Sequence, residues 1–233
     1  FDDVALLDEY DVYEQLMTYW HNVMHDDLFL IMHEGWVEAA RPRHTIQDKD
    51  RKLSEDADLV IGTGRNKTKY KMDLIPPNLI VARYFADEQA RVDEFNAELE
   101  AASQSVEEYV EEHAVEEGLL EGAIDDDKIN KTLTRARLRE AKKEGSDPEE
   151  IAALEHLLGL YEDESAAKKA AKEAQAELDT ATLKKYADLT ETQVQTLVLD
   201  DKWAATIRGR LTSEVNALAL GLVGRIQELG ERY

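Results

Sequence analysis

Apolar residues recur at spacings of three and four along two long stretches of the chain. The first stretch opens at Pro76 and Pro77, and a proline is tolerated in the first turn of a helix because its missing N–H is not needed there. The recurring positions that follow are Val81, Phe85, Val92, Phe95, Leu99, Ala102, Val106, Tyr109 and His113. This repeat is typical of a heptad seam, so the pattern predicts a helix over residues 76–113.

The second stretch begins with good helix-starting residues. Asp147 suits the N-cap, Pro148 the first helical position, and Glu150 a capping box. Its apolar positions are Ile151, Leu154, Leu157, Leu158 and Tyr161, then Ala167, Ala171, Ala174, Leu178 and Ala181. Each predicted helix holds roughly 38–40 residues, or about 57–60 Å at 1.5 Å per residue. Two helices of equal length predict an antiparallel hairpin, with residues 114–147 as its tip and Asn130 capping a short basic helix there.

The first 75 residues predict a small α+β module. Asp11 and Glu14 have capping-box spacing before an amphipathic helix. The apolar run at residues 28–32 either finishes this helix or forms a buried strand, and we interpret it as a strand. Residues 48–55 are interpreted as a solvated loop, residues 59–61 as a strand and residues 62–66 as a turn. Residues 67–72 alternate in character, which completes a small antiparallel sheet packed on the first helix.

Two further helices are expected after the hairpin. Thr190 and Gln193 form a capping box for a short helix that runs through Val198. Asp200 or Asp201 is then expected to cap a last helix, which is apolar nearly all round near residues 217–223 and should be buried on more than one side. The predicted fold is mostly α: an α+β module with a short antiparallel sheet at residues 1–75, then a helical coiled-coil arm and a C-terminal helix at residues 76–233.

Charge narrows the possible partners. The chain carries 28 basic and 51 acidic residues, a net charge of −23, so it will not coat nucleic acid non-specifically. There is no cysteine, which excludes disulfides, thiolate metal sites and cysteine nucleophiles and fits the reducing cytoplasm.

No apolar run is long enough to span a bilayer, so we expect no membrane contact. The chain starts at Phe1 without an initiator methionine, and we expect a piece of a longer protein.

Candidate catalytic and metal-binding patterns are weak. His21 and His25 lie four residues apart but have no third ligand nearby, so we interpret them as ordinary surface or half-buried histidines. The acidic run 125–127 lacks the glycine and terminal glutamate of a calcium loop. Gly62 and Gly64 are too few for a nucleotide loop and favour a hairpin turn. The residues alone therefore predict no enzyme, cofactor or metal site, but a scaffold or docking element.

Two groups of residues are candidates for binding. The first is the most basic segment of the chain, with Arg65, Lys67, Lys69 and Lys71. A lysine row on an edge strand either protects the edge from aggregation or contacts phosphates, in which case these four residues are DNA-contact candidates. The second group lies on the last helix, where the partner-docking candidates are Leu218, Leu222, Ile226 and Leu229, and Gly221 and Gly224 leave room for a neighbouring backbone.

Several short stretches, in the same order, resemble one bacterial protein family. They are LLDEYDVY at residues 6–13 with YW at 19–20, DD at 26–27 with GW at 35–36, DLIPP at 73–77 with IVARYF at 80–85, EGLL at 117–120, DDKW at 200–203, and GRIQEL at 224–229 with ERY at 231–233. Together they resemble the region after the catalytic domain in the M (modification) subunits of type I restriction-modification systems, and they cover essentially the whole chain.

The resemblance implies a function by association. M subunits methylate adenine N6 with S-adenosylmethionine, a separate S (specificity) subunit reads the DNA sequence, and an R (restriction) subunit cleaves and translocates. The chain lacks the Asn-Pro-Pro-aromatic motif and the glycine-rich cofactor loop, so it resembles only the non-catalytic C-terminal part. That part is expected to supply helices to a bundle with the S subunit and to contact DNA in the complex. The alternative is a stand-alone helical adaptor or dimerising coiled coil unrelated to methylation.

Overall fold

The computed structural model describes residues 8–48, 53–114, 118–124 and 128–231. The fold is dominated by helices, with a small antiparallel sheet near the N-terminus, as the sequence predicts. The chain divides into two compact units, one of residues 1–85 with 179–233 and the other of residues 86–178. This division differs from the predicted boundary after residue 75, because the last helices share a core with the N-terminal part.

The first unit begins with consecutive helices: α1 (Glu9–Tyr19), the π-helical segment η1 (Trp20–Met24), α2 (His25–Glu34) and α3 (Trp36–Ala39). The cap of α1 is Asp8, which forms a capping box with Asp11, three residues before the predicted one. The strand predicted at residues 28–32 is wrong, because these residues lie in α2. Ile31 is buried there while Phe29 and Met32 are exposed, which is the one-sided burial of an amphipathic helix.

The main sheet has the order β1-β5-β4, with β1 (Arg43–His44), β4 (Leu59–Ile61) and β5 (Thr68–Lys71) paired antiparallel. Its core side packs with α2, not with α1 as predicted. The segment predicted as a loop contains a two-stranded hairpin, β2 (Gln47–Asp48) and β3 (Leu53–Ser54). The predicted turn contains the 3-10 helix η2 (Gly64–Asn66). Gly62 in this turn has φ +90°, and a Cβ at this position would lie 2.5 Å from the backbone carbonyl oxygen of Asn66.

Helices that precede and follow the hairpin in sequence complete the first unit. They are α4 (Pro77–Tyr84), α8 (Glu191–Thr196), the π-helical segment η4 (Leu197–Ala204) and α9 (Ala205–Glu231). The capping box of Thr190 and Gln193 is confirmed. The predicted cap at residue 200 or 201 is wrong, because the backbone remains helical through η4. Asp201 instead accepts a hydrogen bond from Arg83 Nη2 at 2.7 Å.

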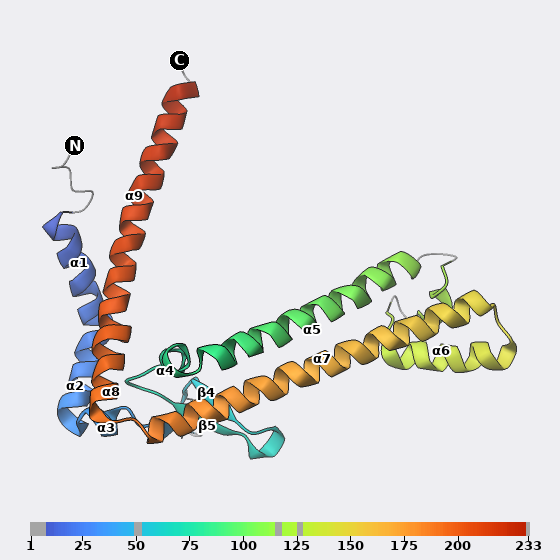
Figure 1. Cartoon of the computed structure of the whole chain (residues 1–233), viewed down its shortest axis with the longest axis horizontal. Helices are drawn as coiled ribbons and strands as arrows, with labels where there is room; N and C mark the ends of the chain where they lie inside the picture. The colour runs from blue at the N-terminus through green and yellow to red at the C-terminus, as the bar shows by residue number, and fades with distance from the viewer. Residues whose placement is uncertain (1–7, 49–52, 115–117, 125–127, 232–233) are drawn as a thin grey trace. The chain divides into compact units, whose positions relative to one another are not determined.

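The second unit is the predicted antiparallel hairpin. Its helices are α5 (Ala86–His113), the 3-10 turn η3 (Glu121–Ala123), α6 (Lys131–Glu144) and α7 (Pro148–Ala187), the last of which continues into the first unit (Figure 1). Ser103 of α5 donates to Glu164 of α7 at 3.0 Å, and Tyr109 of α5 donates to the Ala153 carbonyl at 3.4 Å. As residue numbers rise on α5 they fall on α7, which confirms the antiparallel pairing.

The predicted first arm is interrupted. It starts with Pro77 at its first turn as expected, but Phe85 leaves the helical region with φ −134° and ψ 33°. The stretch therefore forms α4 and α5 instead of one helix. The core of the hairpin is made by α5, η3, α6 and α7 together, through Val106, Leu120, Ala123, Ala141, Ala153, Leu154 and Leu157.

Opposite charges hold α6 at the tip of the hairpin. Asn130 caps α6 as predicted, accepting from the backbone N–H groups of residues 132 and 133. Lys142 pairs with Glu155 of α7 at 2.6 Å, and Arg137 Nε donates to Glu150 at 2.7 Å. The Glu150 carboxylate thus binds α6, whereas a capping box was predicted. The acidic run at residues 125–127 lies outside the described residues.

Candidate functional site: a basic strand surface and an apolar helix end

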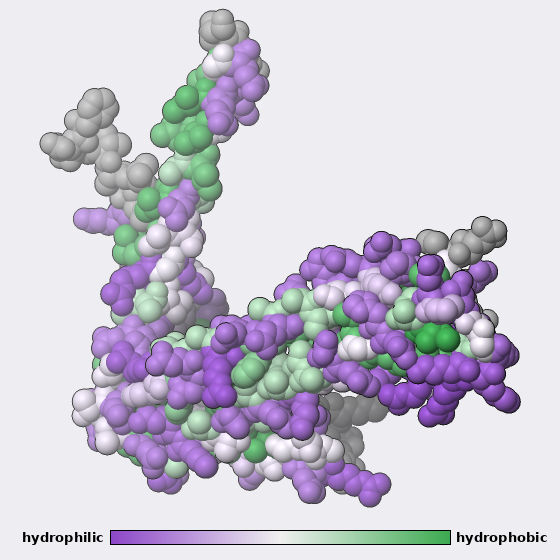
Figure 2. Space-filling model, turned by 45° about the vertical axis from the view of Figure 1, so that its right-hand side comes forward, coloured by the Kyte–Doolittle hydropathy of each residue, from purple (hydrophilic) through white to green (hydrophobic). Residues whose placement is uncertain are grey.

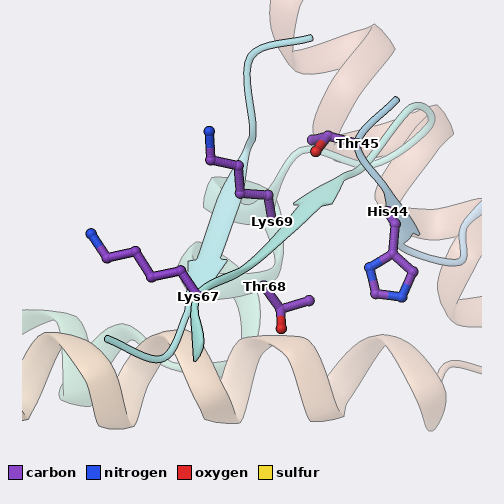
Figure 3. Close-up of a pocket in the computed structure, with 5 residues that line it drawn as sticks. All are labelled: His44, Thr45, Lys67, Thr68 and Lys69. Atoms are coloured by element: carbon purple, nitrogen blue, oxygen red, sulfur yellow. The ribbon is translucent and has the colours of Figure 1, made fainter. Parts of the chain in front are cut away.

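Strand β5 and the turn before it carry the basic candidates. Arg65, Lys67 and Lys69 are exposed, and none of the three forms an ion pair with another described residue. Lys67 and Lys69 point to the same side of β5, as their alternation predicts (Figure 3). We call Arg65, Lys67 and Lys69 the basic strand surface.

The basic strand surface borders an open pocket of about 300 Å³, lined by His44, Thr45, Lys67, Thr68 and Lys69 (Figure 3). No local sequence pattern predicts a role for His44 and Thr45. They arrive through the pairing of β1 with β5, in which His44 faces Tyr70 and the Thr45 N–H donates to the Lys69 carbonyl at 3.2 Å. His44 pairs with Tyr70 and points, with Thr68, to the side of the strands opposite Lys67 and Lys69 (Figure 3). The lysine side therefore combines two ammonium groups with the Thr45 hydroxyl, a chemistry suited to a phosphate.

Lys71, the fourth basic candidate, has a different environment. Its Nζ lies 2.8 Å from Asp58 Oδ1, and the Met72 N–H donates to the second carboxylate oxygen at 2.8 Å. The hydrogen bond that the Lys71 ammonium donates to the Asp58 carboxylate raises the pKa of Lys71 and keeps the ammonium charged. Lys71 therefore ties the end of β5 to the chain before β4, and its charge is already compensated within the sheet.

Arg43 fixes β1 beside β5. Its two terminal nitrogens donate to the Glu55 carboxylate at 2.8 and 2.9 Å, and one of them also donates to Asp73 at 3.0 Å. The hydrogen bonds from Arg43 and from the Ile46 N–H lower the pKa of Glu55 to about 2. This network lies beside the pocket and holds the strand that supplies His44.

The far end of α9 is apolar and exposed. The exposed fractions are 43% for Leu218, 72% for Leu220, 58% for Leu222, 51% for Val223, 60% for Ile226 and 45% for Leu229, and Figure 2 shows these apolar side chains gathered along the helix. We call these six residues the α9 apolar end. The expected burial on several sides is wrong for the chain alone, since no described residue of α9 is buried.

Helix α1 lies against α9 and carries exposed aromatic side chains of its own. The two helices contact each other, and the Arg210 guanidinium of α9 lies 5.1 Å from the centre of the Tyr19 ring. On α1, Tyr10 and Tyr13 are 81% and 60% exposed. At Gly221 and Gly224 of α9 an added Cβ would meet nothing within 4 Å, so a neighbouring backbone has free access.

The two histidines considered as metal ligands do not form a metal site with other described residues. His21 and His25 are both exposed, and His25 Nδ1 lies 3.3 Å from Asp26 Oδ1. Within the described residues, no three histidine, aspartate or glutamate side chains are placed to hold a metal ion. Among the helices that the structure describes, none combines the length and the apolar character needed to cross a bilayer.

A scan against protein-family models, a search of curated proteins and a search of solved structures gave no match to this chain. The proposals below therefore rest on the residues, their geometry and the resemblance described above.

Proposed function

We propose that this chain is the C-terminal, non-catalytic part of the M subunit of a type I restriction-modification system. In this proposal its role is assembly: it docks on the S subunit, and it contacts the DNA backbone in the complex that also contains the R subunit. The parent chain would be a site-specific adenine-N6 DNA methyltransferase of the cytoplasm, with S-adenosylmethionine bound in its catalytic domain and not in these residues. The collinear resemblance supports the family.

The single observation that carries the assembly role is the α9 apolar end. Contiguous exposed apolar side chains on a soluble domain mark interaction surfaces, and a helix that is apolar on several sides is normally buried. Full burial of one such side chain contributes about 1.5–3 kcal/mol, so two or three of them are enough to anchor a subunit contact. A helical region of the S subunit is the partner that the resemblance implies.

The basic strand surface supports the second part of the proposal. Arg65, Lys67 and Lys69 have no acidic partner among the described residues, which is unusual on a chain of net charge −23. Two lysines on one side of β5 and of the residue before it can follow a phosphate backbone. Such contacts position a protein on DNA without reading the sequence, which fits a complex in which the S subunit reads the bases.

Substitutions on α9 test the assembly role. Leu222→Glu and Ile226→Glu should each abolish co-purification with the S subunit, because a buried unpaired carboxylate opposes docking. Met32→Glu is the matched control, since Met32 is 79% exposed on α2 of the same unit and away from the α9 apolar end. If both α9 variants keep their helical circular dichroism and still bind the S subunit, the docking surface lies elsewhere.

The alternative function is a helical adaptor that dimerises through the same surface. The α9 apolar end favours it as well, because a second copy of the chain could cover those side chains. Two observations separate the functions. An Asn-Pro-Pro-aromatic motif encoded upstream of Phe1 supports the M subunit, whereas a dimer of the purified chain that is lost in Leu222→Glu, with no such motif upstream, supports the adaptor.

A further inference from the structure

Two π-helical segments flank the pair of helices that carries the exposed apolar surface. η1 follows α1, and η4 precedes α9. A π turn closes with an i to i+5 hydrogen bond, so it holds about one residue more than an α turn. Each residue of a helix corresponds to about 100° of rotation. The π geometry of η4 therefore sets the direction in which the side chains of α9 point, relative to α8 and the core.

A buried ionic cluster holds η4 in place. The Lys202 ammonium lies 2.7 Å from the Asp27 carboxylate of α2 and donates to the Leu74 carbonyl at 2.6 Å. The Trp203 indole N–H donates to the same carboxylate at 2.8 Å. Asp27 is only 5% exposed. Two consecutive residues of η4 are thus bound to one carboxylate of a helix far away in the sequence, and a buried charge cluster of this kind is strongly disturbed when one member is removed.

A second set of contacts joins the end of α1 to the start of α9. The Tyr19 hydroxyl donates to the backbone carbonyl of Lys202 at 3.3 Å, and the Thr206 hydroxyl donates to the same carbonyl. Tyr19 is buried, and its ring also receives the Arg210 guanidinium. The rotation of α9 and its contact with α1 are therefore fixed at one place, around Lys202.

We propose that Asp27, Lys202 and Trp203 are positioning residues that fix the rotation of α9 and thereby present its apolar end, together with α1, as one docking surface. Without the Asp27 carboxylate, η4 can adopt α-helical geometry. Each extra residue that a π turn holds relative to an α turn then corresponds to a rotation of α9 by about 100°. A side chain at a helix radius of about 5–6 Å moves by roughly 8 Å in such a turn. The consequence for S-subunit binding rests on the proposed function, but the rotation itself does not.

Spin labels can measure the rotation, because the chain contains no cysteine of its own. Labels at Glu14→Cys on α1 and Asn216→Cys on α9 occupy two exposed positions. Pulsed electron–electron double resonance should give one narrow distribution of distances between the two spin labels in the labelled parent. Asp27→Asn should shift or broaden it by several ångström, up to roughly 8 Å. Trp203→Phe removes the N–H donor to Asp27 and part of the ring that packs on the core, but leaves the Lys202 ion pair in place, and it should produce a smaller change in the same direction.

Asp58→Asn is the matched control, because it makes the same chemical change at a carboxylate that binds a lysine and a backbone N–H elsewhere in this unit. Its distance distribution should equal that of the parent. If circular dichroism shows that Asp27→Asn unfolds, Trp203→Phe decides alone. Unchanged distances in every folded variant of Asp27 and Trp203 would overturn the proposal. A changed distance with undiminished S-subunit binding would uphold the positioning role and count against this surface as the docking site.

Discussion

Replacing Lys67 and Lys69 together by glutamine should weaken DNA binding by the assembled complex on all sequences alike. Both side chains are exposed on one side of β5, and neither has an acidic partner among the described residues. Each lysine that contacts a phosphate releases a counterion, which contributes about 0.9 unit to the slope of log affinity against log salt. Loss of two contacts should therefore flatten the slope by up to about 1.8 units.

The structure makes this prediction selective. When the salt concentration rises from 50 to 200 mM, the variant with a slope flatter by about 1.8 units should lose roughly tenfold less affinity than the parent loses. Lys71→Gln should leave the slope unchanged, because Lys71 is paired with Asp58, and it should instead reduce the stability of the sheet. A sequence-based expectation would treat Lys67, Lys69 and Lys71 alike, so the comparison tests the structure directly.

Fluorescence anisotropy of a labelled duplex, titrated with the complex at several salt concentrations, measures the slope. The matched control is Lys168→Gln with Lys172→Gln, which removes the same two charges from exposed positions of α7. If the variant of Lys67 and Lys69 has the same slope as the parent, or if the control variant flattens it equally, these lysines do not contact phosphates. They would then serve only to protect the edge of the sheet.

Two further predictions concern stability. Leu157 is fully buried in the core of the hairpin, so Leu157→Ala should lower the free energy of unfolding, measured in urea, by about 2–5 kcal/mol. Leu160 is half-buried on the same helix, so Leu160→Ala should lower it by less, and equal losses would contradict the described core. The pKa of Glu55 is lowered from 4.5 to about 2 by Arg43 and the Ile46 N–H, so its contribution is complete above pH 4.5 and is lost as the pH falls towards 2. Between pH 5 and pH 2 the parent should therefore lose more stability than Glu55→Gln, and identical pH profiles would refute the role of this carboxylate.

The parts of the fold that could be predicted from sequence depend on local patterns. The antiparallel arms follow from apolar positions three and four apart, the start of α6 from Asn130, and the start of α8 from the capping box at Thr190. In each case, neighbours in sequence satisfy the backbone or share one helix face. The apolar character of the end of α9 could also be predicted, because the residues near 217–223 are apolar on nearly every side of the helix. Its exposure could not, because that depends on which other residues cover it.

The parts that were missed depend on distant residues or on ambiguous short segments. A five-residue apolar run fits a strand and a buried helix face equally well, and α2 is decided by its packing in the core. Phe85 interrupts the first arm without a glycine or proline to signal it. Lys202 meets Asp27 across 175 positions of sequence, so neither the cluster nor the π segment that it holds has a local signature. Thr45 lies beside Lys69 only because β1 pairs with β5.

Amide hydrogen exchange of the chain with and without the S subunit tests the docking claim most directly. The exposed helix end should exchange readily in the free chain, since its residues make few tertiary contacts. A stoichiometric S subunit should slow amide exchange in residues 217–229 of α9 and leave exchange in the hairpin core at residues 153–157 unchanged. Binding of the S subunit with protection confined to the hairpin, or no protection of α9 at saturating S subunit, would contradict the docking claim.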